Sequence, residues 1–98
     1  MKVEWSQPAR EDQVQIRAYI AADARQFVER IIGSVRKLRE FPLIGHTVPE
    51  AERADARELI YQNYRIVYLV ESERVFVLGV IHGSRDTTRS ANQPWEIG

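Results

Sequence analysis

The chain contains no cysteine and carries no net charge. The absence of cysteine excludes disulfide bonds and thiolate metal sites, and it suits a reducing compartment. With only His46 and His82 as imidazole ligands, we expect no metal site and no cofactor. Fourteen basic residues balance fourteen acidic ones, so no overall field attracts nucleic acid, and any such contact must depend on a local basic cluster.

Long apolar runs are also absent. No segment approaches the length of a membrane-spanning helix, and the opening residues Met-Lys-Val-Glu-Trp lack the features of a signal peptide. We therefore expect a cytoplasmic protein with no membrane partner. The 98 residues are enough for one domain with a single two-layer core. We predict one domain over residues 1–98, in which residues 84–98 form a polar C-terminal tail.

The first half of the chain has clear helical periodicity. Residues 2–5 alternate polar and apolar side chains, as in a short strand. Ser6 and Pro8 then give a helix-start signal, and the capping-box spacing of Asp23 and Gln26 predicts the start of a second helix. The second helix carries the strongest amphipathic pattern of the chain, formed by Phe27, Val28, Ile31, Ile32, Val35 and Leu38.

Strand patterns dominate the second half. The second helix should end at Phe41-Pro42, and residues 42–56, with proline and glycine among acidic side chains, should form a loop. Three strands follow at about 57–61, 64–71 and 74–82, joined by two-residue turns. The order β-α-α-β-β-β predicts an α+β fold, with a helical hairpin packed on one face of a mostly antiparallel four-stranded sheet.

The register of the last two strands decides which side chains share a face. If Ser72-Glu73 is the turn, Arg65 lies opposite Val80. One face then carries seven residues, which are Arg65, Val67, Leu69, Phe76, Leu78, Val80 and His82. A slip of one residue would move Arg65 to the other face.

The helical hairpin can cover only one face of the sheet, and the charged Arg65 and the titratable His82 favour leaving their own face uncovered. An exposed apolar patch that needs a partner would result, formed by Val67, Leu69, Leu78 and Val80. Beside it, a local basic cluster could form from Arg57, Arg65, Arg85 and Arg89. The alternative for Arg65 is an ion pair with Glu58 or another carboxylate, worth only about 0–1 kcal/mol if exposed.

The last strands carry the most specific motifs of the chain. Asn63-Tyr64-Arg65-Ile66-Val67-Tyr68 is followed by a strand that ends in His82-Gly83-Ser84-Arg85-Asp86. With the preceding helices and strand, this order and spacing resembles the RelE/ParE superfamily, the toxins of bacterial type II toxin–antitoxin systems. The resemblance implies a growth-inhibiting toxin that is neutralised by a cognate antitoxin encoded beside it. Contact with operator DNA would be indirect, through the antitoxin.

The superfamily includes RelE-like toxins, which are ribosome-dependent mRNA endonucleases. Such chemistry needs a base, a cation for the phosphorane charge and an acid for the leaving oxygen. Arg65 and Arg85 fall on the positions of the cationic groups, and His82 is a candidate acid–base group because its ordinary pKa of about 6.5 suits proton transfer. The chain departs from this group in having no lysine in residues 50–62 and no tyrosine after Tyr68.

ParE-like toxins lack the nuclease set and are thought to bind and inhibit DNA gyrase. The long amphipathic second helix, the Pro42-x-x-Gly45 turn and the pair His82 and Asp86 resemble this group, and the zero net charge suits it better than a ribosomal nuclease. We therefore favour a ParE-like gyrase inhibitor with no enzymatic activity. The RelE-like endoribonuclease stays open, as does a toxin that binds its antitoxin but harms nothing. In each case we predict partner binding by Arg57, Arg65, Val67, Leu69, Leu78, Val80, His82 and Arg85.

Overall fold

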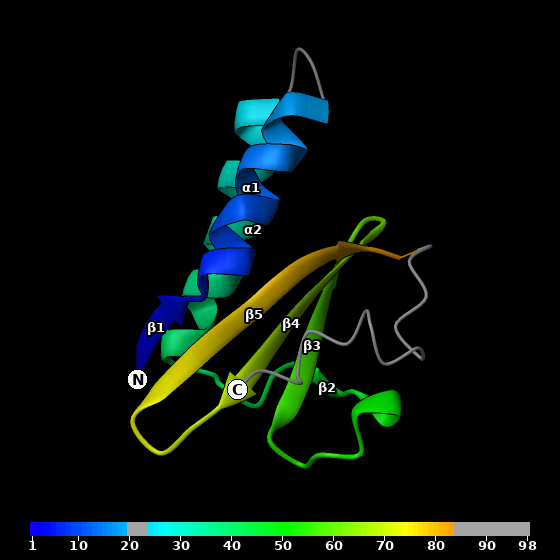
Figure 1. Cartoon of the computed structure of the whole chain (residues 1–98). Coiled ribbons are helices and arrows are strands. Elements are labelled where there is room, and N and C mark those ends of the chain that lie inside the picture. The colour runs from blue at the N-terminus through cyan, green and yellow to red at the C-terminus, as the bar shows by residue number, and fades with distance from the viewer. Residues whose placement is uncertain (20–23, 84–98) are drawn as a thin grey trace.

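A computed structural model describes residues 1–19 and 24–83. Two helices form a hairpin beside a twisted sheet (Figure 1). The sheet has the order β1-β5-β4-β3-β2, in which β1 runs parallel to β5 and the other neighbours are antiparallel. In chain order the elements are β1 (Lys2–Trp5), α1 (Gln7–Tyr19), α2 (Ala24–Arg36), η1 (Lys37–Arg39), β2 (His46–Thr47), η2 (Pro49–Ala51), β3 (Ala56–Tyr61), β4 (Tyr64–Val70) and β5 (Arg74–His82).

The predicted α+β class is confirmed, and so are the three strands of the second half. The sheet has a fifth strand, because His46 and Thr47 pair with Glu58 and Arg57 inside the segment that we expected to be a loop. Two residues are too few to show the alternation that marks a strand in a sequence. The second helix passes into a 3-10 turn at Lys37 rather than continuing to Phe41.

Ser6 fixes the start of α1, as its position before Pro8 predicts. Its buried Oγ accepts a hydrogen bond from the N–H of Ala9 at 3.1 Å, which satisfies one of the free amides of the first turn. The same hydroxyl donates to the carbonyl of Leu78 at 3.0 Å, and so ties the helix to β5. The predicted cap of the second helix involves Asp23, which lies outside the described residues.

The helical hairpin covers one face of the sheet, and the core forms between them. The amphipathic stripe of α2 is confirmed, since Val28, Ile31 and Val35 are buried there. They pack with a row of sheet residues on the same face, which are Ile66, Tyr68, Val75, Val77 and Val80. Phe27 also packs against this core.

The opposite face of the sheet is buried as well, which corrects our expectation of an exposed patch. The exposed fractions of Val67, Leu69, Leu78 and Val80 are only 0, 4, 2 and 4%. The first three belong to a second core cluster that includes Val48 and Ala51, because the connection through η2 folds back onto the sheet. Val80 belongs instead to the core beneath the helices. These side chains therefore stabilise the monomer through packing.

A β-bulge between β4 and β5 explains why Val80 changes face. Near the turn the predicted register is confirmed, with Leu69 opposite Phe76 and Tyr68 opposite Val77. Between Val67 and Tyr68 the register shifts by one residue, so that Arg65 lies opposite Ile81 and not opposite Val80. Beyond the bulge, each side chain of β5 therefore lies on the face opposite to the one that we predicted.

Candidate functional site

Arg65 lies on the sheet face opposite the helices, with its guanidinium between two carboxylates. Its Nε donates to Oε2 of Glu58, on β3, at 2.7 Å, and its Nη2 is 2.9 Å from Oε1 of Glu50, in η2. The side chains of all three residues are more than three-quarters buried. The competing interpretation of Arg65 as an ion-pair partner of Glu58 is therefore confirmed, with Glu50 as a second carboxylate.

The electrostatics of this site favour the charged guanidinium. Burial alone would lower the pKa of Arg65, but the hydrogen bonds and attraction from Glu50 and Glu58 outweigh it and raise the pKa above its ordinary value. Among the described residues, two carboxylates thus contact this one guanidinium. A phosphate group would have to displace one of them and enter beside the other.

His82 lies on the other face of the sheet, and so the predicted neighbourhood of Arg65 and His82 is wrong. His82 pairs across the strands with Tyr64, and the two rings meet edge to face at 5.3 Å between centroids. Tyr64 in turn contacts Phe27 of α2, at 5.5 Å between centroids. The cause is the bulge, which moves His82 to the helical side. Both residues nevertheless line a hollow of about 350 Å³ where β4 begins and β5 ends.

Arg57 and Tyr68 hold the loop that follows η1. The hydroxyl of Tyr68 donates to the carbonyl of Pro42 and accepts from the N–H of Gly45, both at 3.0 Å. Arg57 donates from Nη1 to the carbonyls of Leu43 at 3.2 Å and Gly45 at 2.8 Å. Arg57 thus holds the backbone of this loop, and its role in partner binding stays a prediction. Burial raises the pKa of Tyr68, so its hydroxyl keeps the proton that it donates.

The same loop exposes three large apolar side chains that our sequence analysis did not single out. Phe41, Leu43 and Ile44 have exposed fractions of 59, 61 and 57%. The signal was present as Phe41 at the predicted end of the second helix and Leu43 and Ile44 within the predicted loop, next to Pro42 and Gly45. Such residues on a rigid loop are a common feature of protein interfaces.

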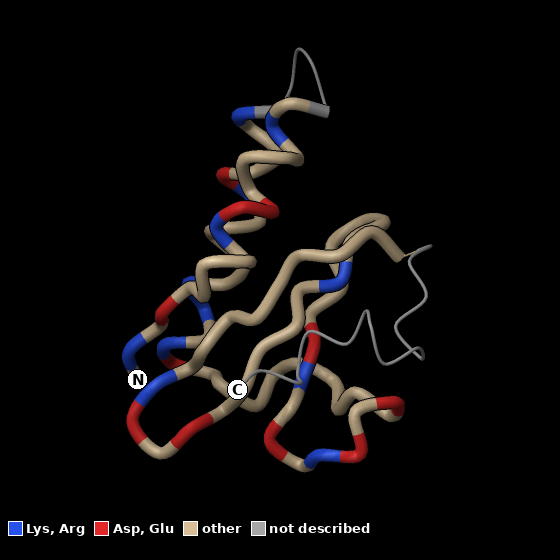
Figure 2. The backbone as a smooth tube through the Cα atoms, viewed as in Figure 1, with Lys and Arg blue, Asp and Glu red and all other residues tan. Residues whose placement is uncertain are grey.

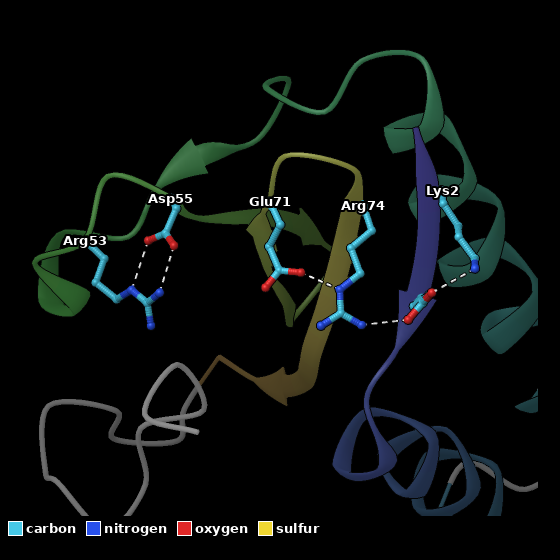
Figure 3. Close-up of polar contacts among 6 residues, drawn as sticks. Lys2, Arg53, Asp55, Glu71 and Arg74 are labelled. Atoms are coloured by element: carbon cyan, nitrogen blue, oxygen red, sulfur yellow. Dashed lines mark hydrogen bonds and ion pairs between the residues drawn. The ribbon is translucent and has the colours of Figure 1, made fainter. Parts of the chain in front are cut away.

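Further ion pairs lie at the other end of the sheet (Figure 3). Arg74 hydrogen-bonds through Nε to Glu71 and through Nη1 to Glu4 at 2.7 Å, and its guanidinium stacks 4.1 Å from the ring centroid of Phe76. Glu4 also forms an ion pair with Lys2, in which Oε1 of Glu4 is 3.2 Å from Nζ of Lys2. The hydrogen bonds from Arg74 and then Lys2 lower the pKa of Glu4.

Basic and acidic residues are interspersed along the described backbone (Figure 2). Within residues 1–19 and 24–83, no group of three His, Asp or Glu side chains is placed to hold a metal ion. No helix in those ranges is long and apolar enough to cross a membrane. Arg85 and Arg89, which we predicted in the basic cluster, lie outside the described residues.

Comparison with known proteins identifies the family. No curated protein matches the chain significantly. Among solved structures, two similar ones share the fold at 20% identity. The chromosomal ParDE toxin–antitoxin system of P. aeruginosa has a TM-score of 0.69, and the match covers 84% of this chain and 95% of that chain. The RelBE2 toxin–antitoxin complex of Mycobacterium tuberculosis has a TM-score of 0.63, and the match covers 83% of this chain and 95% of that chain. Residues 3–87 match the family model of the ParE toxin of the type II toxin–antitoxin system parDE. The chain therefore belongs to the ParE toxin family of type II toxin–antitoxin systems.

Proposed function

We propose that this toxin inhibits growth by binding DNA gyrase, that it performs no chemistry itself, and that a cognate antitoxin neutralises it. The family match over residues 3–87 supports the toxin class. The structures with the same fold come from a ParDE system and a RelBE2 complex, which supports an antitoxin partner. The observation that carries the choice of gyrase over mRNA is the state of Arg65.

Arg65 is poorly placed for phosphoryl chemistry. A nuclease needs a cation that can approach the phosphorane, but Glu50 and Glu58 already neutralise this guanidinium. His82, the candidate acid–base group, extends from the opposite face of the sheet. No lysine in residues 50–62 supplies a replacement cation. A toxin without a catalytic set can still act by occupying a surface of its target.

The proposal is tested with purified toxin in two assays run at the same concentrations. In the first, DNA gyrase supercoils relaxed plasmid in the presence of ATP, and we expect the toxin to block this reaction. In the second, a translating extract receives the toxin and its mRNA is mapped by primer extension, and we expect full-length mRNA. Active gyrase together with cut mRNA would overturn the proposal.

One observation favours the alternative, a RelE-like endoribonuclease that uses Arg65, Arg85 and His82. Arg65 and His82 both line the hollow where β4 begins and β5 ends, and a nucleotide there could reach each of them. In this case Arg85→Ala and His82→Gln would abolish both mRNA cleavage and toxicity, while antitoxin binding survives. Under the gyrase proposal His82→Gln keeps its toxicity.

A further inference from the structure

A groove of about 510 Å³ lies between β1 and the C-terminal end of α2 with η1. It is at the β1 edge of the sheet and shares no residue with the site around Arg65. Five of its described lining side chains are apolar, namely Met1, Val3, Trp5, Ile32 and Val35, and three are basic, namely Lys2, Arg36 and Arg39. No acidic residue of the described part of the chain lines it.

The basic side chains of this groove are available to a partner. Arg36 and Arg39 are exposed, and neither forms an ion pair with any residue in the described ranges. Lys2 does contact Glu4 at 3.2 Å, but its side chain stays 74% exposed. The dipole of α2 favours a cation in its last turn, which accounts for Arg36 alone. It gives no reason for Arg39 and Lys2 to face the same groove.

The floor of the groove is apolar. Val3, Trp5 and Ile32 are only partly buried, and they pack against the core between helices and sheet. They therefore present the open side of the core to the groove. A partner that covers them gains apolar burial in addition to its contacts with the basic rim.

The backbone of β1 offers a further means of binding. β1 is an edge strand whose single neighbour is β5. Within the described residues, the backbone hydrogen bonds outside helices and strands involve no outer-edge group of Lys2–Trp5. An extended segment can add to such an edge, as in other cases of strand addition. Four residues of β1 would pair with about 13 Å of extended chain.

We propose that an extended acidic segment of the antitoxin, with at least one apolar side chain, binds in this groove along β1. This inference rests on the proposed function, because it takes the antitoxin as the partner. The charge of the rim selects carboxylates, and the floor of Val3, Trp5 and Ile32 selects an apolar residue between them. A nucleic acid fits less well, because an apolar floor offers nothing to a phosphate backbone and Glu4 lies beside Lys2.

The first test compares two double charge reversals that change the net charge equally. Arg36→Glu with Arg39→Glu alters the groove, and Arg10→Glu with Arg17→Glu alters exposed positions of α1 away from it. Affinity for the antitoxin encoded beside the toxin gene is measured by titration calorimetry, after circular dichroism shows equal folding. We expect the groove variant to bind at least about tenfold more weakly and the control to change less than about threefold.

The outcomes separate this inference from the proposed function. If the wild-type toxin binds no antitoxin, the proposed partner and the groove assignment both fail. If the wild-type toxin binds and the two double variants weaken equally, or not at all, the groove assignment fails and the antitoxin remains the partner.

A second test detects binding in the groove through the NMR signal of Trp5. Trp5 lines it, and Trp95→Phe leaves Trp5 as the single tryptophan of the toxin. In this variant labelled with ¹⁵N, we expect the indole N–H signal of Trp5 to shift on addition of unlabelled antitoxin and to stay unchanged with duplex DNA or transfer RNA. An unchanged signal in the antitoxin complex, or a shift with nucleic acid alone, would contradict the proposal.

Discussion

Arg65 and Glu58 form a diagonal pair across the antiparallel strands β4 and β3, with Nε and Oε2 2.7 Å apart. Diagonal neighbours in a sheet are close enough for long side chains to meet. Glu50 approaches the same guanidinium from η2, which folds over this face. The pair therefore joins the sheet to the connection that buries its second face.

Replacement of Arg65 by Ala should destabilise the fold. The variant removes the guanidinium that lies between two largely buried carboxylates, and we expect a loss of about 2 kcal/mol in the free energy of unfolding. Urea unfolding at pH 7 measures it. Adding Glu50→Gln and Glu58→Gln to Arg65→Ala removes the repulsion and should recover part of the loss. A single variant as stable as the wild type would show that the ion pairs contribute nothing.

Ser6→Ala should lower the stability of the fold by more than the loss of a helix cap alone. The hydroxyl accepts from Ala9 and donates to Leu78, so its removal frees a helix amide and a carbonyl of β5. We expect a loss of about 1–2 kcal/mol in urea unfolding. Ser34→Ala is the matched control, because within the described residues the hydroxyl of Ser34 donates back to the carbonyl of Arg30 in its own helix α2. The control should change stability by less than about 0.5 kcal/mol. Equal effects would argue against the double role of Ser6.

Two glycines should respond in opposite ways to substitution by Ala. A Cβ at Gly45 would meet the carbonyl oxygen of Glu58 and the hydroxyl of Tyr68, each at 2.5 Å. Because the backbone carbonyl cannot move aside, we expect Gly45→Ala to lower the free energy of unfolding by about 2–3 kcal/mol. A Cβ at Gly33, inside α2, meets nothing within 4 Å. Gly33→Ala should raise the free energy of unfolding by about 0.5–1 kcal/mol, since alanine is the better helix former. Thermal unfolding of both variants checks the difference in sign.

Most of the architecture was predictable because its signals are local. The stripe from Phe27 to Leu38 has helical period, and the strands of the second half follow apolar runs bounded by the turns Gln62-Asn63 and Ser72-Glu73. The face assignments were right along β4 and in β5 near the second turn, and wrong in β5 beyond the bulge. A single extra residue in β5 reverses every later side chain, and counting from a turn cannot detect that.

A signal for the bulge did exist in the sequence. Gly79 interrupts an otherwise apolar run, and glycine inside a strand often marks a bulge. The groups that stabilise the bulge are distant in sequence: Ser6 bonds the carbonyl of Leu78, and Asp12 of α1 accepts from the N–H of Val80 at 2.9 Å. The pairing of Arg65 with Glu50 likewise depends on how residues 42–56 fold back, for which periodicity gives no information.

Acid should weaken the fold partly through Glu4 and Asp55. Hydrogen bonds from Arg74 and Lys2 lower the pKa of Glu4 below its ordinary 4.5, and the fork of Arg53, at 2.7 and 2.9 Å, lowers that of Asp55 below 3.8. A carboxyl whose pKa is lower in the folded state contributes stability above its unfolded pKa. The contribution is lost as the pH falls through the folded pKa.

The thermal midpoint should therefore decline as the pH drops from about 5 to below 3. The double variant Glu4→Gln with Asp55→Asn should be less stable than the wild type at pH 7, and the difference should shrink on acidification because the wild-type carboxyls then lose their charge. Glu40→Gln is the control, since Glu40 is exposed and forms no ion pair within the described ranges. The thermal midpoint of the Glu40→Gln variant should decline at low pH as that of the wild type does. A difference that stays constant from pH 7 to 3 would mean that these ion pairs do not couple protonation to folding.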